Sequence, residues 1–303
     1  MENLINSFLD YLKLERACSS GTVLKYGAHL LDFERYLKGI DEELTLETAT
    51  GDLVRDWMMQ LRERGDKAST INARLSSLRT FYKYLLRKGI VTVDPMLKVH
   101  GMKKSKPLPS FVREEDMDAI LDESRFADTW EGKRDRLILQ MFYETGMRRA
   151  ELCGLNESDV DYYRSVIKVT GKRNKQRLIP FGDELCESMQ AYQTAMHAEV
   201  EATDGAFFVR KDGTRYSYAS LYQLVHRHLS QTSLEKRSPH VLRHTFATAM
   251  LNNGAELQSV KELLGHESVS TTEIYTHTTF EELKAVYEQA FPRERERKHS
   301  SAQ

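Results

Sequence analysis

The segment from Ser238 to His277 constrains the fold more than any other part of the chain, because its helix-capping and helix-terminating residues predict a run of short helices. Ser238 followed by Pro239 is typical of a helix N-cap with proline at the first helical position. Gly254 is typical of the end of that helix, and a second apolar stripe then continues to Gly265. Two helices joined by a tight turn are expected here, with a third one following.

The first of these helices is predicted to have two different faces. At about 100° per residue, His240, Arg243 and His244 share one sector. The opposite sector carries the apolar residues Leu242, Phe246, Ala249 and Met250. Free N–H groups and the helix dipole favour an anion such as phosphate at this N-terminus. Each polar side chain taken alone could equally be structural. An i, i+4 histidine pair can also bind a metal, but Arg243 would repel a cation, so no metal site is expected.

A third, short helix is predicted from Ser270, which has the form of a capping box with Glu273, and Tyr275 lies on it. The whole segment contains H-x-x-R-H at residues 240–244, L-G-H at residues 264–266, and Tyr275 nine residues after the last histidine. This order resembles the C-terminal signature of the tyrosine recombinases, the phage-integrase family. The amino-acid sequence around these motifs is most similar to that of the Xer-type branch, the bacterial site-specific recombinases.

A second stretch, Thr145–Leu152, resembles the T-G-x-R-x-x-E-L motif of the same family. The resemblance gives Arg148 the role of the first catalytic arginine and Glu151 that of the acidic residue that helps to position the site. Arg149 is the alternative if the register is shifted, but the spacing to Glu151 favours Arg148.

Strand-like runs at Ser165–Thr170 and Gln176–Pro180 flank a basic turn that contains glycine and asparagine. This pattern predicts a β-hairpin. By resemblance it is the hairpin whose lysine reaches into the active site, and the position of that lysine is Lys172. Arg173 replaces the glycine that usually follows, which leaves Lys175 as a lesser candidate.

The residues named in these motifs supply each group that cleavage of a phosphodiester requires. The predicted catalytic set is Arg148, Lys172, His240, Arg243, His266 and Tyr275. Tyr275 would attack phosphorus while the two arginines hold the phosphoryl oxygens by charge-assisted bonds. Because tyrosine has an ordinary pKa near 10, the cations and His240 must ease its deprotonation. Lys172 would protonate the leaving 5′-oxygen, and His266 would donate to the phosphate. The reaction conserves bond energy, so no cofactor, ATP or metal is expected.

The rest of the chain predicts a second domain. Residues 1–100 show the periodicity of four or five helices and resemble the core-binding, SAM-like domain of the family. Glycine, prolines and lysines at residues 101–110 predict a linker. A catalytic domain over residues 111–292 and a charged tail over residues 293–303 follow. The expected fold class is mainly α with a small β-hairpin or sheet, arranged as a two-domain, C-shaped DNA clamp.

The charge distribution indicates where DNA would bind. The net charge is only −1, but residues 62–106 contain 12 Lys or Arg and 3 Asp or Glu, a local charge of +9. This suits an electrostatic footprint confined to one face, although a solvated helix balanced by acids elsewhere gives the same count. The candidate DNA-binding residues are Arg74, Arg79, Lys83, Lys103, Lys104 and Arg227.

Composition and termini exclude several other classes of protein. Three scattered cysteines argue against a disulfide framework or zinc ribbon and fit a reducing compartment. The N-terminal residues are charged every few positions, unlike a signal peptide, and no apolar run is long enough to cross a bilayer. A cytoplasmic protein that does not bind a membrane is expected.

The resemblance also implies partners. They are double-stranded DNA with an inverted-repeat recombination site, and three further protomers in a homo-tetramer or a hetero-tetramer with a paralogous recombinase. A DNA translocase is a further candidate. The apolar stripe of residues 280–290 predicts a last helix, which packs either on its own domain or on a neighbouring protomer. The implied activity is Xer-like resolution of chromosome or plasmid dimers. The alternatives are a mobile-element integrase, a DNA invertase, a type IB topoisomerase-like enzyme and a DNA-binding protein without activity.

Overall fold

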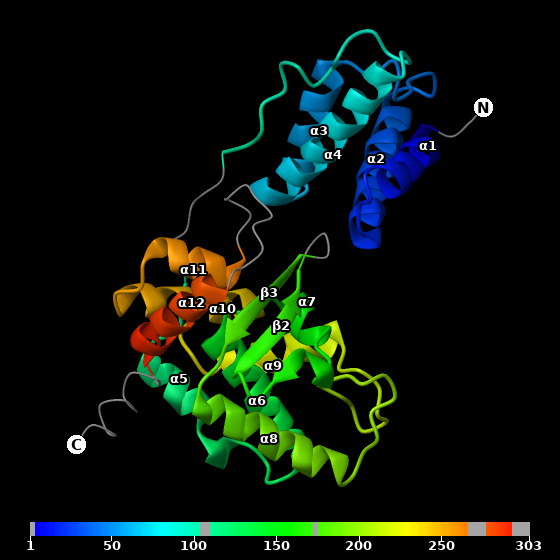
Figure 1. The fold of residues 1–303 in the computed structure, drawn as a ribbon. Helices are drawn as coiled ribbons and strands as arrows, with labels where there is room; N and C mark the ends of the chain where they lie inside the picture. The colour runs from blue at the N-terminus through cyan, green and yellow to red at the C-terminus, as the bar shows by residue number, and fades with distance from the viewer. Residues whose placement is uncertain (1–3, 104–109, 172–174, 266–276, 293–303) are drawn as a thin grey trace. The chain divides into compact units, whose positions relative to one another are not determined.

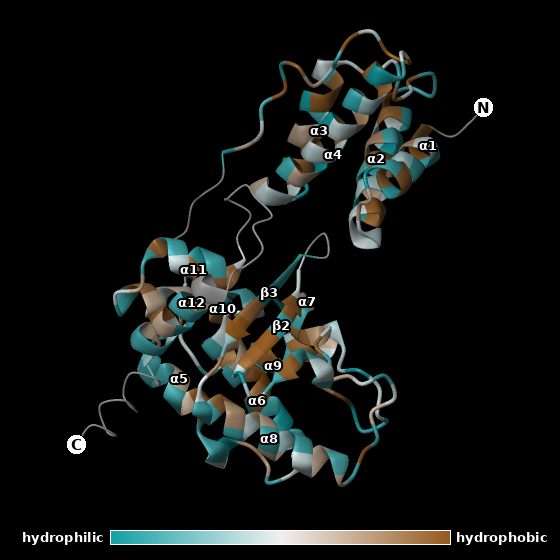
Figure 2. Cartoon of the chain, viewed as in Figure 1, coloured by the Kyte–Doolittle hydropathy of each residue, from teal (hydrophilic) through white to brown (hydrophobic). Residues whose placement is uncertain are grey.

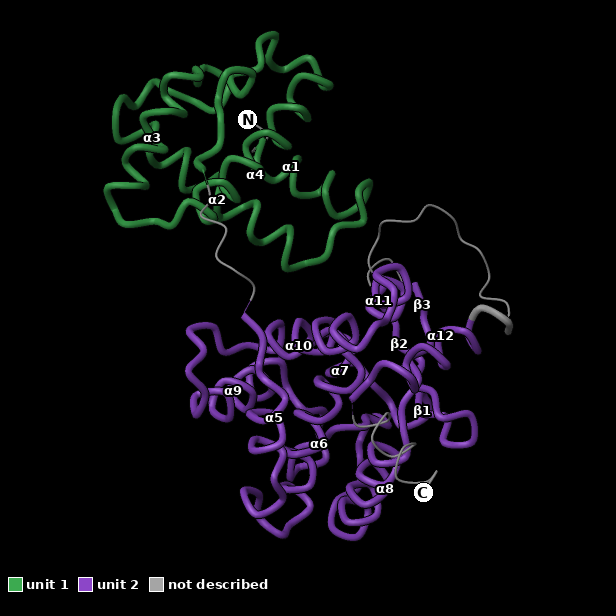
Figure 3. Tube along the Cα trace, turned by 90° about the vertical axis from the view of Figure 1, so that its left-hand side faces the viewer, with its two compact units in different colours: residues 1–107 green, residues 108–303 purple. Residues whose placement is uncertain are grey.

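A computed structural model describes residues 4–103, 110–171, 175–265 and 277–292. The chain divides into two compact units, Met1–Pro107 and Leu108–Gln303 (Figure 3). The division falls in the stretch that glycine, proline and lysine mark as a linker in the sequence. Across the described residues, no helix is both long enough and apolar enough to span a membrane.

Unit 1 is a bundle of helices around one apolar core (Figure 1). Its core includes the fully buried rings of Phe8, Phe33, Trp57 and Phe81. The helices are α1 (Leu4–Asp10), the π-helical turn η1 (Tyr11–Glu15), α2 (Ser20–Ile40), α3 (Gly51–Glu63) and α4 (Ala68–Arg87). The expectation of a helical N-terminal region is confirmed.

Unit 2 combines helices with one small antiparallel sheet, and the mainly α fold class is therefore confirmed (Figure 1). The strands are β1 (Val160–Asp161), β2 (Val166–Thr170) and β3 (Gln176–Pro180), in the order β1-β2-β3. The helices are α5 (Glu114–Leu121), α6 (Trp130–Thr145), α7 (Arg149–Cys153), α8 (Asp183–His197), α9 (Tyr218–Leu229), α10 (Pro239–Asn252), α11 (Leu257–Leu264) and α12 (His277–Ala290). Short 3₁₀ turns lie at Glu123–Arg125 and Glu157–Asp159. Helix α6 is central, because it packs against both α8 and α10.

The predicted hairpin forms with its strands in the expected place. Val166 pairs with Pro180 and Thr170 pairs with Gln176, and the Gly171 N–H donates to the Lys175 carbonyl across the turn at 2.7 Å. Figure 2 shows that β2 is apolar along most of its length. The strand is therefore held against the core of unit 2, and the turn of the hairpin has a fixed base.

The last helix packs on its own unit in this chain. Helix α12 contacts α10, α11 and β3. The ring of Phe291 lies 5.3 Å from that of Tyr143 and 6.0 Å from that of Phe246. Tyr287 is 1% exposed and stacks on Phe291. Of the two packing modes that the sequence leaves open, the structure contains the intramolecular one.

The turn between α6 and α7 depends on Gly146. Its φ is 56°, and an added Cβ would lie 2.4 Å from Cδ1 of Phe246. We expect Gly146→Ala to lower the free energy of unfolding by about 2–4 kcal/mol, through backbone strain and overpacking together. Gly205→Ala is the matched control, because Gly205 has a φ of 67° and nothing within 4 Å of an added Cβ. Its expected cost is roughly 1 kcal/mol. Urea unfolding measures both, and equal losses would contradict the packing account.

Candidate active site

The T-G-x-R-x-x-E-L stretch folds into a sharp corner that presents Arg148. Gly146 ends α6 in the left-handed conformation, and Arg148 is the N-cap residue of α7. The backbone N–H of Arg148 donates to Oε2 of Glu151 at 2.6 Å. A carboxylate three residues into a helix satisfies one of the N–H groups left without a partner there. The spacing of arginine and glutamate is therefore a requirement of the local backbone as well as of the site.

Glu151 is a buried carboxylate that holds two arginines. Its side chain is 1% exposed. It accepts from Nη1 of Arg148 at 2.8 Å and from Nη1 and Nη2 of Arg177 at 2.7 and 2.9 Å. Burial raises the pKa of Glu151, but the bonds and charges of Arg177 and Arg148 outweigh burial and leave that pKa below its ordinary value. Glu151 is therefore ionised at neutral pH, and its charge fixes both guanidinium groups.

Arg243 enters the same region from α10. It is 9% exposed, and its Nη1 and Nη2 donate to the carbonyl oxygens of Gly146 and Leu264, both at 2.6 Å. Burial, followed by the charges of Arg148 and Arg177, lowers the pKa of Arg243 to about 10. The guanidinium group is still protonated at neutral pH, so it is a buried cation.

The C-terminus of α11 gathers all three arginines. Three successive carbonyl oxygens, which have no partner inside the helix, each accept from a different guanidinium group. Leu263, Leu264 and Gly265 accept in that order from Arg177 at 2.8 Å, Arg243 at 2.6 Å and Arg148 at 2.6 Å. Cations also interact favourably with the negative end of a helix dipole. Because the next residue is His266, the arginines are anchored at the point where the chain enters the predicted nucleophile segment.

Arg148, Arg177, Arg243 and Glu151 form what we call the arginine cluster. Three cations and one anion give it an excess of two positive charges. Within the described part of the chain, hydrogen bonds engage all three guanidinium nitrogens of Arg177 but only the Nη atoms of Arg148 and Arg243. Since a guanidinium group has five N–H donors, Arg148 and Arg243 retain donors for an oxyanion.

The polar sector of α10 differs in exposure from residue to residue. His240 and His244 are exposed, as expected for a polar sector, but Arg243 is buried. Arg243 can be buried because the carbonyl groups of Gly146 and Leu264 satisfy its Nη atoms. The sector that these three residues share is therefore exposed at its histidines and buried at its arginine.

Lys172, His266 and Tyr275 lie outside the described residues, as does Lys104. The described residues next to Lys172 and His266 nevertheless lie at the arginine cluster. A Cβ added at Gly171, next to Lys172, would lie 3.5 Å from Oε1 of Glu151. The carbonyl oxygen of Gly265, next to His266, accepts from Nη2 of Arg148. Gly171 and Gly265 therefore lie in the same small region of unit 2.

Arg177 is the residue of this site that sequence reasoning missed. The sequence pattern places it only in a strand-like run. The signal is the period of two in β3, where Arg177 and Ile179 are buried and Leu178 between them is 37% exposed. An arginine on the inward face of a strand must find a buried acceptor, and Glu151 supplies it.

The alternative arginine, Arg149, points elsewhere. Its guanidinium group lies 5.1 Å from the ring centre of Tyr218 and 6.0 Å from that of Tyr222, both on α9. Such cation–π contacts are typical of a surface arginine packed on aromatic faces. The geometry favours Arg148 as the residue in the cluster.

The candidate DNA-binding residues of α4 differ in their freedom. Arg74 is bound to Asp32 at 2.5 Å and to Asp66 at 3.5 Å, and Arg79 donates to the Val99 carbonyl at 2.8 Å. Lys83 on α4 and Lys103 beyond it are exposed. Arg74 would have to leave two carboxylates to bind a phosphate, and the assignment of Lys83, Lys103 and Arg74 to DNA binding stays a prediction.

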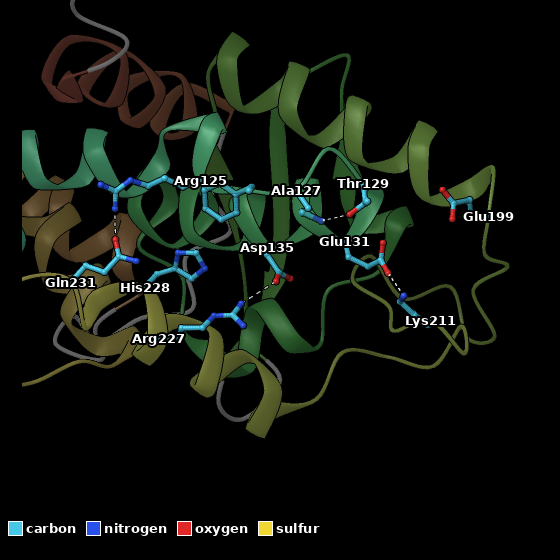
Figure 4. Close-up of a pocket in the computed structure, with 12 residues that line it drawn as sticks. Arg125, Ala127, Thr129, Glu131, Asp135, Glu199, Lys211, Arg227, His228 and Gln231 are labelled. Carbon is cyan, nitrogen blue, oxygen red and sulfur yellow. Dashed lines mark hydrogen bonds and ion pairs between the residues drawn. The ribbon is translucent and has the colours of Figure 1, made fainter.

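Arg227 lines a surface cavity of 710 Å³ between α6, α9 and the segment around Lys211 (Figure 4). Arg227 lies 3.4 Å from Asp135, and Lys211 lies 2.8 Å from Glu131. Arg125 donates to Gln231 across the same cavity. Its cations are thus balanced by acceptors, and no member of the arginine cluster is among the described residues that line it. The assignment of Arg227 to DNA binding stays a prediction.

Comparison with known proteins identifies the family of the chain. The phage integrase family matches residues 110–282, and the family's N-terminal SAM-like domain matches residues 5–89. The tyrosine recombinase XerC of Bacillus licheniformis is 35% identical and covers 97% of both chains. The tyrosine recombinase XerD of Oceanobacillus iheyensis is 31% identical and covers 97% of this chain and 99% of its own.

Solved structures show the same fold. The XerH site-specific recombinase bound to a palindromic difH substrate superposes with a TM-score of 0.71 at 21% identity, covering 90% of this chain and 81% of its own. The resemblance seen in the residues is confirmed by these comparisons. The chain belongs to the phage integrase family and is a tyrosine recombinase, an enzyme that cleaves and rejoins DNA strands.

Proposed function

We propose that this enzyme acts as a Xer-type recombinase on an inverted-repeat site in double-stranded DNA and resolves dimers of a chromosome or plasmid. Relatives named XerC and XerD match nearly the full length of the chain. The XerH structure, a fold relative, was solved on a palindromic substrate. In the proposed complex, both units bind the DNA.

The charge of the arginine cluster is the observation that carries the proposed chemistry. A phosphodiester has one negative charge, and attack by a tyrosinate adds a second one in the transition state. The excess of two positive charges in the cluster matches that total. Donors already fixed by Glu151 and by helix α11 need no reorganisation as the charge develops. Arg148 and Arg243 would bind the two non-bridging oxygens.

The other roles follow from the order of bond changes. The Tyr275 oxygen forms a bond to phosphorus while the bond to the 5′-oxygen breaks. Lys172 gives its proton to that oxygen, His240 assists deprotonation of the tyrosine, and His266 donates to the phosphate. The product is a 3′-phosphotyrosyl link and a free 5′-hydroxyl. A second strand's hydroxyl can reverse the step, so no energy source is needed.

Four protomers would hold two duplexes and exchange strands in pairs through a four-way junction. The similarity to both XerC and XerD relatives favours a paralogous partner in a hetero-tetramer over a homo-tetramer. A DNA translocase is a further proposed partner. The same similarity ranks dimer resolution above integration of a mobile element or DNA inversion.

Covalent capture tests this function. The full-length protein is incubated with nicked duplexes made from candidate sites of its own genome, in the presence of EDTA. We expect an adduct that resists SDS. Because of the nick, the short fragment that carries the new 5′-hydroxyl dissociates after cleavage, so it cannot reverse the step and the phosphotyrosine is trapped. The protein could bind a site specifically and yet form no adduct there, either alone or with a paralogue added. That result would show a DNA-binding protein without recombinase activity.

The general acid can be identified with a modified leaving group. We expect Lys172→Ala to slow cleavage by about 10²–10⁴-fold, the usual contribution of general acid catalysis. A 5′-bridging sulfur should restore much of the rate, since a thiolate leaves without a proton. Lys175→Ala is the control, with little loss on either substrate. If the sulfur substrate restored cleavage only to Lys175→Ala, Lys175 would be the general acid. If it restored cleavage to neither variant, Lys172 would have a structural role.

A further inference from the structure

The structure assigns to Arg177 the role of a positioning residue, which holds Glu151 and thereby aims Arg148 at the scissile phosphate. This inference rests on the proposed role of Arg148 as a phosphate-binding residue. Arg177 lies on β3, two strands and a hairpin turn away from α7 in sequence, and its side chain is 7% exposed.

The bonds of Arg177 indicate positioning rather than contact with DNA. Nη1 and Nη2 form a bidentate pair with the two oxygens of Glu151, and Nε donates to the Leu263 carbonyl. The fork geometry of arginine suits this planar arrangement, which lysine cannot reproduce. Arg177 thus uses three of its five N–H donors on groups of the protein and has a side chain that is 7% exposed, whereas Arg148 uses two and has a side chain that is 32% exposed.

The carboxylate between the two arginines transmits the effect. Oε1 of Glu151 accepts from both Arg148 and Arg177, at 2.8 and 2.7 Å. Without Arg177, Glu151 would be a buried anion with a single cationic partner, a state that is strongly disfavoured. The carboxylate would then turn or take up a proton, and in either case the bond that orients Arg148 would change.

Arg177 also supports the other bond of Arg148. A Cβ added at Gly265 would lie 3.1 Å from Cδ and from Nη1 of Arg177, so the side chain passes directly under this residue. The Gly265 carbonyl is the second acceptor of Arg148. Arg177 therefore bonds to one acceptor of Arg148, Glu151, and packs against the residue that supplies the other, Gly265.

The test compares cleavage of an ordinary phosphodiester with cleavage of a methylphosphonate at the scissile position. A methylphosphonate lacks the charge on one non-bridging oxygen, so an arginine that neutralises this charge becomes less important. We expect Arg177→Met to slow cleavage of the ordinary substrate by about 10²-fold, the cost of a small misplacement in an active site. Arg177→Lys should show a smaller loss. On the methylphosphonate, the deficits of Arg177→Met and Arg148→Ala should both shrink.

Arg134→Met is the matched control. Counted over the whole residue, Arg134 and Arg177 are both 8% exposed. Arg134 is paired with Asp135 at 2.7 Å and has none of its bonds in the arginine cluster. It should lower the unfolding temperature without changing the ratio of the two cleavage rates. Thermal unfolding and DNA affinity are measured for each variant, and if Arg177→Met does not fold, Arg177→Lys takes its place with the same expected change of ratio.

Three results would overturn the inference. Normal cleavage by a folded Arg177→Met would remove the positioning role. A second result is an equal loss of cleavage rate by Arg177→Met on both substrates, while the loss by Arg148→Ala is smaller on the methylphosphonate. It would show that Arg177 serves stability alone. Normal cleavage by Arg148→Ala would instead refute the phosphate-binding role of Arg148, and the role of Arg177 with it.

Discussion

Tyr275→Phe is expected to form no covalent adduct with nicked site DNA while binding that DNA as tightly as the wild type. The substitution removes only the phenolic oxygen, which is the atom that must bond to phosphorus. The rest of the proposed site, including the arginine cluster, is unchanged. Covalent capture after SDS denaturation measures the first quantity, and a gel-shift titration measures the second. The expected loss is complete rather than partial, because no other group of the side chain can replace the nucleophile.

Tyr287→Phe provides the control for this experiment. Tyr287 is on α12, is 1% exposed and stacks on Phe291 with ring centres 5.4 Å apart. A side chain in that environment cannot approach a phosphate without unpacking the helix. We expect Tyr287→Phe to form the adduct at the wild-type rate. An adduct that persists in Tyr275→Phe and disappears in Tyr287→Phe would reverse the assignment, and mass spectrometry of the DNA-linked peptide would identify the residue used.

Arg148→Ala is expected to slow cleavage by about 10³-fold or more, since a fixed cation acting on a transferring phosphoryl group contributes on this scale. Its side chain is 32% exposed, so the substitution should disturb folding less than loss of the buried Arg243. Glu151 keeps its bidentate partner Arg177 in this variant. Single-turnover cleavage of a nicked substrate, at saturating protein, separates this effect from weaker binding.

Arg149→Ala tests the register of the same motif. Arg149 is next to Arg148 in sequence, but its guanidinium group stacks over Tyr218 and Tyr222. We expect Arg149→Ala to retain the wild-type cleavage rate at saturating protein. A large loss for Arg149→Ala with normal cleavage by Arg148→Ala would place Arg149 in the catalytic role.

Local signals predicted the elements of the site well. Proline after Ser238 marks the start of α10, and glycine marks the end of α11 at Gly265, where φ is 65°. The hairpin followed from two β-rich runs around a turn. These features depend on residues close together in sequence, so a single chain contains all the information needed to predict them.

Tertiary partners could not be predicted in the same way. Arg177 and Glu151 are 26 residues apart, and only the packing of β3 beside α7 brings them together. Arg74 shows the same limit in unit 1, because its partner Asp32 comes from α2, 42 residues earlier. A helical wheel places a charge on a face of its own helix, but it does not contain the neighbour that this face meets.

The bonds at the end of α11 make the length of that helix more important than most of its side chains. The three arginines recognise the peptide backbone at Leu263, Leu264 and Gly265. Removing one residue from the helix would rotate these carbonyl groups by about 100° around its axis. We therefore expect exposed residues of α11 to tolerate substitution, whereas a single insertion or deletion there would misalign three guanidinium groups at once. Among homologous sequences, this segment should change in composition but not in length.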